Sequence, residues 1–289
     1  MRLALCCLLT LLLGACAQTP RAVDDAPAPL PSAEDAVRAH NERVARLDRL
    51  WARAIVTIRF TDERGERKWE QGDGHFQLKD ASKLALSIGK VGEVLVWIGA
   101  NDKRFWIIDR LNDDETLLFV GRHDATTRGE FQRAGLPVPP KQLLRLGALR
   151  PIDAADAHVS PEAEGRLAVT VPDADGAWRY VFEPAPDDDM PLVVQRLNAD
   201  GGVLLESSLE QPKLVDMNDG RGGWPPRMFS RLLVTHVPTG DSISLLLDGE
   251  ITDGRRRGVP NDAVFDLDVL TNAYGPIDRV VELGESEPG

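Results

Sequence analysis

The sequence predicts a mainly β protein of the α+β class, with about eleven strands in an antiparallel meander, one amphipathic helix before them and one short helical insert. Short runs of alternating apolar residues recur roughly every 10–15 residues, and tight turns separate them. That spacing is typical of antiparallel hairpins, because βαβ units need a helix between successive strands. Only two segments have the spacing of a helix.

The composition is that of a globular, acidic protein. The 289 residues include 34 Lys and Arg against 46 Asp and Glu, which gives a formal net charge of −12. This balance disfavours nucleic acid as a partner, because the chain has no excess of basic residues with which to bind phosphates. The three cysteines, Cys6, Cys7 and Cys16, all lie at the start, which excludes a disulfide, a Cys-ligated zinc site and a catalytic thiol from the remaining chain.

The first residues are expected to be an export signal and a lipid attachment site. A positively charged start precedes an apolar run that is too short to span a bilayer of about 30 Å. Leu13-Gly14-Ala15-Cys16 resembles the lipobox of bacterial lipoproteins, in which the Cys receives diacylglycerol and the signal is cut before it. This resemblance implies a signal peptide over 1–15, lipid attachment at Cys16 and a Pro-rich tether over 16–31. The alternative is an ordinary signal peptide followed by an unrelated cysteine.

Acyl chains on Cys16 would hold the protein to a membrane, at about 0.8 kcal/mol for each buried methylene. Ala17, rather than Asp, follows the Cys. In enterobacterial lipoproteins this position resembles the signal for outer-membrane sorting. The resemblance therefore implies a lipid-anchored protein of the cell envelope, on the periplasmic face of the outer membrane. Residues 32–289 are expected to form a single domain.

A capped amphipathic helix is expected at the start of this domain. Ser32 can cap its N-terminus, and Asp35 lies three residues later, as in a capping box. Its apolar face is expected to consist of Val37, Val44, Leu47 and Trp51, with His40 and Asn41 in the same stripe. Because one side is apolar, the helix must lie on another element.

Period-two alternation places the strands. We expect them at residues 55–60, 68–78, 84–88, 94–98, 105–108, 117–120, 167–171, 178–182, 192–197, 202–209, 229–237 and 242–247. Gly72-Asp73-Gly74 is predicted to form a bulge or turn inside the second of these segments. Pro139-Pro140 precedes the helical insert, Lys141 to Leu149, and the tail after Leu270 shows little pattern.

The usual catalytic and metal-binding motifs are absent from the sequence, so we predict no catalytic residues, no metal site and no cofactor. The five histidines are scattered singly, and none has a partner at ligand spacing. Asp173-Ala174-Asp175-Gly176 resembles only half of a calcium loop, and Asp187-Asp188-Asp189 lies among prolines, so we interpret both as loops. Arg255-Arg256-Arg257 could contact anionic lipid headgroups, although a solvated loop is the simpler interpretation.

The order of these elements resembles that of the LolA/LolB-like family of periplasmic lipoprotein carriers and receptors, over roughly residues 33–270. Three stretches carry the resemblance: the entry into the first strand at 44–54, the hairpin sequence Gly99-Ala100-Asn101-Asp102-Lys103-Arg104-Phe105-Trp106, and Ala263 to Leu267 as a closing strand. The resemblance implies a curved, unclosed half-barrel with the helices over its concave face. It also implies an apolar space for acyl chains, lipid or lipoprotein cargo, and a periplasmic carrier protein as a partner.

Alternate residues of a strand share a face, so three apolar rows are expected to line this space. The expected lining consists of Leu84, Leu86, Ile88, Leu167, Val169, Val171, Ile243, Leu245 and Leu247, with Val44, Leu47 and Trp51 facing them from the helix. The sequence leaves two alternatives, a hollow lipid site and a fully packed core. The first indicates a non-enzymatic lipoprotein that binds acyl chains of lipids or lipoproteins. The second indicates a structural envelope lipoprotein that binds a protein partner.

Replacement of Cys16 tests the anchor. Cys16→Ser is expected to give an uncleaved or soluble protein, whereas the wild type enters the detergent phase, because only the thiol can receive diacylglycerol. Partitioning between detergent and water measures the difference. Equal partitioning of both proteins into the aqueous phase would contradict lipid attachment at Cys16.

Overall fold

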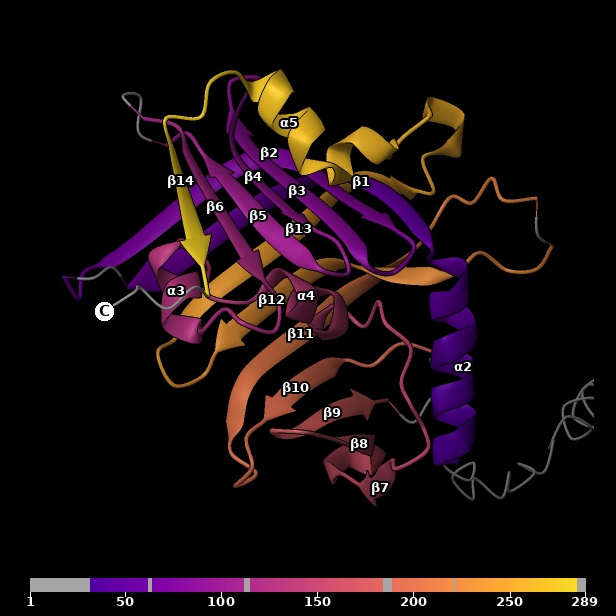
Figure 1. Ribbon diagram of the computed structural model, residues 1–289. Helices are drawn as coiled ribbons and strands as arrows, with labels where there is room; N and C mark the ends of the chain where they lie inside the picture. Colours follow the sequence, from indigo (N-terminus) through magenta and orange to yellow (C-terminus); the bar gives the residue numbers. More distant parts are fainter. Residues whose placement is uncertain (1–31, 62–63, 112–114, 184–188, 221, 285–289) are drawn as a thin grey trace, which may run out of the picture. The chain divides into compact units, whose positions relative to one another are not determined.

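The computed structural model describes residues 32–61, 64–111, 115–183, 189–220 and 222–284. The expected signal peptide, Cys16 and the tether therefore lie outside the described residues. The described part from Ser32 onward contains a single sheet of 14 strands and a few short helices (Figure 1).

Two antiparallel meanders form most of this sheet. The first consists of β1 (Arg49–Thr61), β2 (Arg67–Lys79), β3 (Lys83–Lys90), β4 (Glu93–Ala100), β5 (Arg104–Asp109) and β6 (Leu117–Arg122). The second consists of β7 (His158–Pro161), β8 (Leu167–Asp173), β9 (Gly176–Phe182), β10 (Val193–Leu197), β11 (Val203–Leu214), β12 (Arg227–His236) and β13 (Asp241–Thr252). β1 joins the two meanders by pairing with both β2 and β13. β14 (Arg279–Leu283) pairs with β6 in parallel, in an otherwise antiparallel sheet.

The predicted class, a mainly β protein with a curved, unclosed antiparallel sheet, is confirmed. The predicted number of strands is wrong, because the sheet has 14 rather than about eleven. The twelve segments placed by alternation correspond to β1–β6 and β8–β13. The strands without a predicted segment are β7 and β14, which lie at the two edges of the sheet. All four residues of β7 are exposed, and β14 buries only its last residue, so neither shows an alternation of buried and exposed positions.

The helices are α2 (Ala33–Arg46), α3 (Arg128–Arg133), α4 (Pro140–Leu146) and α5 (Leu267–Tyr274). Two of them were expected: α2 is capped by Ser32, which accepts the Asp35 N–H, and α4 is the insert, ending at Leu146 rather than Leu149. The predicted closing strand at Ala263 to Leu267 is wrong. Those residues form a 3₁₀ turn, η3 (Asp262–Phe265), and the start of α5. The tail after Leu270, expected to lack pattern, continues α5 and ends in β14.

The predicted bulge or turn at Gly72-Asp73-Gly74 is also wrong, because β2 runs through it without a break in its pairing with β1. The two glycines instead allow β3 to approach closely. A Cβ atom at Gly74 would lie 1.7 Å from the carbonyl oxygen of Ser87, and one at Gly72 would lie 2.5 Å from that of Gly89. Only glycine fits where the strands come this close.

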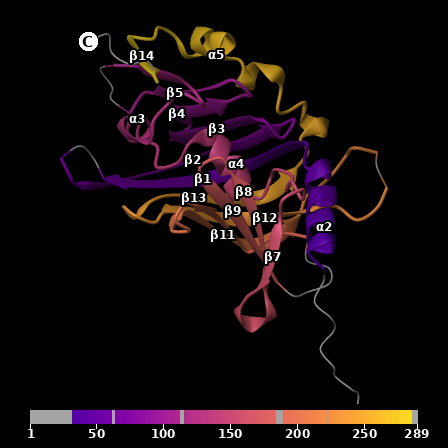
Figure 2. The same cartoon turned by 60° about the horizontal axis from the view of Figure 1, so that its bottom comes forward.

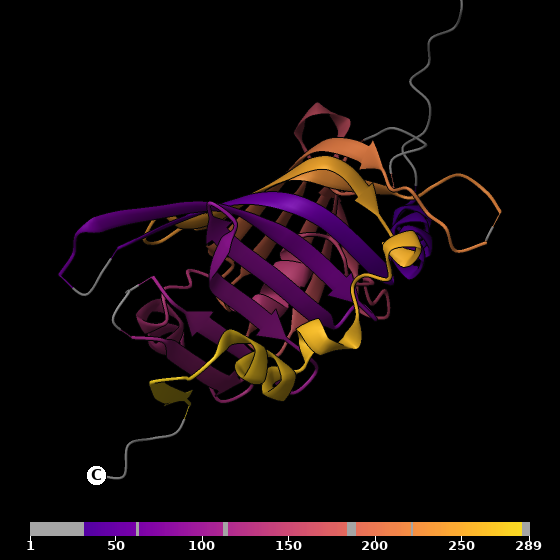
Figure 3. The same ribbon diagram turned by 90° about the horizontal axis from the view of Figure 1, so that it is seen from above.

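The main core lies on the concave face of the sheet. In β1 the buried residues Ala52, Ala54, Val56 and Ile58 alternate with more exposed ones, and they belong to the same apolar cluster as Leu84 and Leu86 of β3. α4 packs in this core, where it contacts β3 and β4 of one meander and β10 of the other. Figures 2 and 3 show strands of both meanders on either side of α4.

A second, smaller core lies on the opposite face of the first meander. Trp97, Trp106 and Ile108 pack there against residues of η3 and α5, including Phe265 and Leu270. Strands β3 to β5 are therefore buried on both faces, which explains their nearly continuous apolar runs.

Buried polar contacts attach α2 to the rest of the fold. Arg43, which is 3% exposed, donates hydrogen bonds to the carbonyl oxygens of Ala148 (2.6 Å), Asp189 (3.1 Å) and Arg227 (3.2 Å). His40 lies 3.0 Å from the carbonyl oxygen of Arg150 through Nε2 and 3.3 Å from Nη2 of Arg43 through Nδ1. The neutral ring with its proton on Nε2 satisfies both contacts, since it donates to the carbonyl and accepts from the guanidinium.

Substitution of Gly74 tests the close approach of β2 and β3. Gly74→Ala is expected to lower the free energy of unfolding by about 3 kcal/mol or more, because the clash is with backbone atoms that cannot move aside. Gly222→Ala is the control, since nothing lies within 4 Å of its added Cβ. Thermal unfolding measures both, and equal melting temperatures would contradict the close approach.

His40 is expected to make the fold acid-sensitive. Burial, together with the Arg43 charge, lowers the pKa of His40 to about 3. The unfolded chain binds this proton near pH 6.5, so stability is lost as the pH falls from about 6.5 toward 3. From pH 7 to pH 5 the loss is about 2 kcal/mol. His40→Gln should show a smaller loss over the same interval in denaturant unfolding. An unchanged pH slope would contradict a neutral, buried His40.

Candidate functional site

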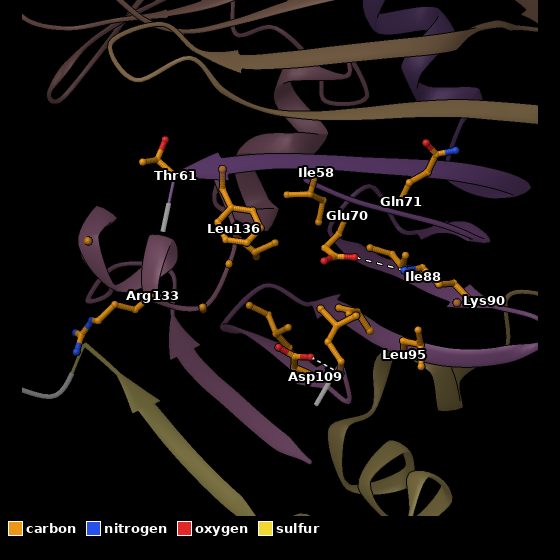
Figure 4. Close-up of a pocket in the computed structure, with 18 residues that line it drawn as sticks. Ile58, Thr61, Glu70, Gln71, Ile88, Lys90, Leu95, Asp109, Arg133 and Leu136 are labelled. Atoms are coloured by element: carbon orange, nitrogen blue, oxygen red, sulfur yellow. Dashed lines mark hydrogen bonds and ion pairs between the residues drawn. The ribbon is translucent and has the colours of Figure 1, made fainter. Parts of the chain in front are cut away.

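A pocket of about 460 Å³ lies on the concave face, at one end of the first meander (Figure 4). Strands β1 to β5 supply one wall, and α3 with the loop after it supplies the other. The volume falls within the range of about 300–1,000 Å³ that is typical of small-molecule sites.

Apolar side chains form the interior of this pocket. Ile58, Ile88, Val96 and Ile107 come from four strands and also belong to the main core, and Leu136 faces them from the loop after α3. Ile58 and Phe60 lie on alternate positions of β1, as Ile107 and Asp109 do on β5, so each pair shares the concave face. The pocket is thus a part of the concave face that the helices do not fill.

The position of α3 keeps this space open on one side. Phe131 of α3 packs on Phe105 of β5, with ring centroids 4.7 Å apart. Glu130 accepts hydrogen bonds from the Thr127 N–H at the start of the helix (2.6 Å) and from the Gly284 N–H just after β14 (2.7 Å). α3 is therefore held between β5 and the end of β14, beside the pocket rather than across it.

Charged residues lie at the rim. Nζ of Lys90 is 3.5 Å from Oε2 of Glu70, the pair joined by a dashed line in Figure 4, and both side chains are about half exposed. Arg133 of α3 lies 3.8 Å from Glu130. Asp109 accepts the N–H of Leu111 at 2.8 Å. Burial raises the pKa of Asp109, the Leu111 hydrogen bond opposes this, and the nearby Glu70 charge adds to it.

A shallower hollow adjoins the pocket and shares Glu70, Gln71, Gly89 and Lys90 with it. Trp69 and Val91 line this hollow and are 63% and 105% exposed. Val91 has a positive φ of 55°, which is uncommon for a β-branched residue. Glu70 pairs with Ile58 of the concave face, so Trp69, one position earlier on β2, lies on the opposite face of the sheet from the pocket. Val91 follows Lys90 of the pocket wall directly and is exposed beside it.

Most of the lining expected from the sequence lies in the packed core. Leu47, Leu84, Leu86, Ile88, Val169, Val171, Ile243, Leu245 and Leu247 belong to one buried cluster. Val44 and Leu167 are also buried. The structure places Ile88 alone of these residues in the wall of the pocket. Alternation identified the face correctly, but it could not show which part of that face the helices leave uncovered.

The prediction that Trp51 faces the strands from the helix is wrong. The helix ends at Arg46, and Trp51 lies on β1, where its alternation with Leu50 and Ala52 turns it away from the main core. Its ring packs beside His75, with centroids 5.2 Å apart, and the Arg257 guanidinium lies 5.0 Å from it.

The charged segments noted in the sequence make internal contacts. Asp173 accepts the indole N–H of Trp178 and lies 3.3 Å from Arg196. Each arginine of the basic cluster lies near an acid: Arg255 near Asp253, Arg256 near Asp216, and Arg257 near Glu250. Among the described residues, no three His, Cys, Asp or Glu side chains are placed to hold a metal ion. Residues 187–188 lie outside the described part.

None of the helices described is both long enough and apolar enough to cross a membrane.

No family model and no curated protein sequence matches this chain. Among solved structures, the chain is similar to a LolA superfamily protein from Nitrosomonas europaea, at 12% identity and a TM-score of 0.43, over 76% of this chain and 93% of that one. It is also similar to a putative outer membrane lipoprotein-sorting protein domain from Vibrio parahaemolyticus, at 14% identity and a TM-score of 0.48, over 76% and 92% of the two chains. A solved structure of a LolA superfamily protein is thus among those that the chain is similar to.

Proposed function

We propose that this protein is a non-enzymatic component of the cell envelope that binds acyl chains of lipids or lipoproteins in the pocket on its concave face. The observation that carries the proposal is the pocket itself, a mainly apolar space of about 460 Å³ whose charged lining residues are Glu70, Lys90, Asp109 and Arg133. Such a site suits a ligand with a long apolar part and a polar end.

The apolar walls supply the binding free energy. Each buried methylene contributes about 0.8 kcal/mol, so a chain with about ten buried methylenes gains about 8 kcal/mol before the costs of association. Asp109 and the Lys90–Glu70 pair lie where the polar end of such a ligand would meet water.

An exposed apolar residue beside the pocket fits an exchange of ligand with another apolar surface. Val91, which follows Lys90 of the pocket wall, would be covered when this side of the pocket touches a membrane or a periplasmic carrier protein, which favours that contact. An acyl chain could then pass into the pocket with little exposure to water. Lipid attachment at Cys16 would hold the protein at the periplasmic face of the outer membrane.

A structural lipoprotein that binds a protein partner is the second candidate. The observation that favours it is β14, which within the described part pairs only with β6 and so leaves one edge free, with Val280 52% exposed. A strand of another protein could pair with this edge.

A pair of substitutions to Trp separates a lipid site from a packed core. Leu95→Trp is expected to block an uncharged fluorescent acyl probe and leave the melting temperature nearly unchanged, because Leu95 lines the pocket and is only partly buried. Leu86→Trp should instead destabilise the fold by about 1–3 kcal/mol, because Leu86 is 1% exposed in the main core.

Fluorescence titration and thermal unfolding of the wild type and both variants provide the two measurements. Binding by the wild type that Leu95→Trp abolishes supports the lipid site. If the wild type binds no acyl chain, the proposal fails and the structural alternative stands.

A further inference from the structure

Asp109 lines the pocket without a basic partner among the residues described. The other acid of the wall, Glu70, pairs with Lys90. Asp109 follows Ile107 by two positions on β5, so its side chain points to the same concave face, and it lies opposite Val96 on β4. Within the described part of the chain, its carboxylate accepts one hydrogen bond, from the Leu111 N–H. The cations of the wall face other acids, since Lys90 lies beside Glu70 and Arg133 beside Glu130.

A carboxylate against apolar walls has unused capacity to accept hydrogen bonds. Asp109 is only partly exposed beside Ile107, Val96 and Leu95, and this burial raises its pKa. A ligand group that donates hydrogen bonds or carries positive charge would supply the missing partner. An anionic group would instead be repelled by the Asp109 carboxylate, because the cations of the wall, Lys90 and Arg133, lie beside other acids.

We infer that the pocket selects single-chain amphiphiles whose polar end donates hydrogen bonds, an ammonium best of all, over those with an anionic end, and that Asp109 makes this selection. The inference rests on the proposed function, because it needs an acyl chain in the pocket. The apolar walls bind any acyl chain equally, so a residue near the polar end of the ligand is needed to distinguish one headgroup from another.

Competition between three ligands of equal chain length tests the inference. The full chain is loaded with 1-aminoanthracene as an uncharged fluorescent reporter, and dodecylammonium, dodecanol and dodecanoate then displace it below their micelle concentrations at neutral pH. The wild type is expected to bind dodecylammonium most tightly and dodecanoate about tenfold or more weakly, because a hydrogen bond to a charged partner is worth about 1.5–3 kcal/mol.

Asp109→Asn removes the charge and keeps the shape and the acceptor for the Leu111 N–H. It should bring the ammonium and carboxylate affinities to within about threefold of each other, with the affinity for the reporter and the melting temperature unchanged. Glu93→Gln is the matched control, because it removes the same net charge. The Glu93 side chain is 62% exposed, pairs with Arg110 and does not line the pocket. This variant should keep the wild-type ratio of the ammonium and carboxylate affinities.

Each outcome is decisive. A wild type that binds the reporter but prefers dodecanoate, or an Asp109→Asn variant that keeps the wild-type ratio, overturns the role of Asp109 and leaves the proposed function standing. If Glu93→Gln reduces the preference for dodecylammonium over dodecanoate as much as Asp109→Asn does, net charge alone selects the ligand. That result also overturns the role of Asp109. A wild type that binds none of the four compounds removes the proposed function and this inference together.

Discussion

The pairing of β1 with both β2 and β13 is the interaction on which the rest of the structure depends. It joins two meanders, from opposite ends of the sequence, into one sheet of 14 strands. A sheet of this size twists and curls rather than staying flat. Gly72 and Gly74 of β2 let β3 approach closely, because a Cβ atom at either position would clash with the β3 backbone. The curvature then creates a concave face that is larger than a few short helices can cover.

The helices are held over this face by specific polar contacts as well as by apolar packing. Arg43 and His40 bind backbone carbonyls and so attach α2 to segments far away in the sequence. Arg145 of α4 donates to the hydroxyl group of Tyr180 at 2.9 Å, and its guanidinium lies 4.6 Å from the centre of the Trp178 ring. These contacts fix α2 beside β8 of the second meander and α4 against β3 and β4 of the first meander and β10 of the second, and α3 is the helix that lines the pocket at the end of the first meander.

The pocket is therefore a consequence of unequal coverage. Where α4 lies, the core is close-packed, and the apolar rows of β3, β8 and β13 have no free space around most of their residues. Where the strand ends extend past α4, the same apolar face lines the pocket, together with the charged side chains of Glu70, Lys90, Asp109 and Arg133. The pocket is the part of the apolar concave face that the helices do not cover.

The sequence by itself determined the class of the fold, the capped α2, the insert α4 and the face to which each apolar row belongs, because these depend on local periodicity and on the chemistry of neighbouring residues. It did not determine β7 and β14, since edge strands with exposed side chains carry no alternation. It placed Trp51 on the helix, because residues 47 and 51 suit a helical spacing equally well and only the pairing of β1 ends the helix at Arg46. The tertiary structure alone decided that Ile88, rather than Leu84 or Leu86 in the same row, lines a pocket, and that Asp109 reaches into it without a basic partner among the described residues. Both follow from the positions of α3 and α4 relative to the sheet, and contacts between segments distant in the sequence fix those positions.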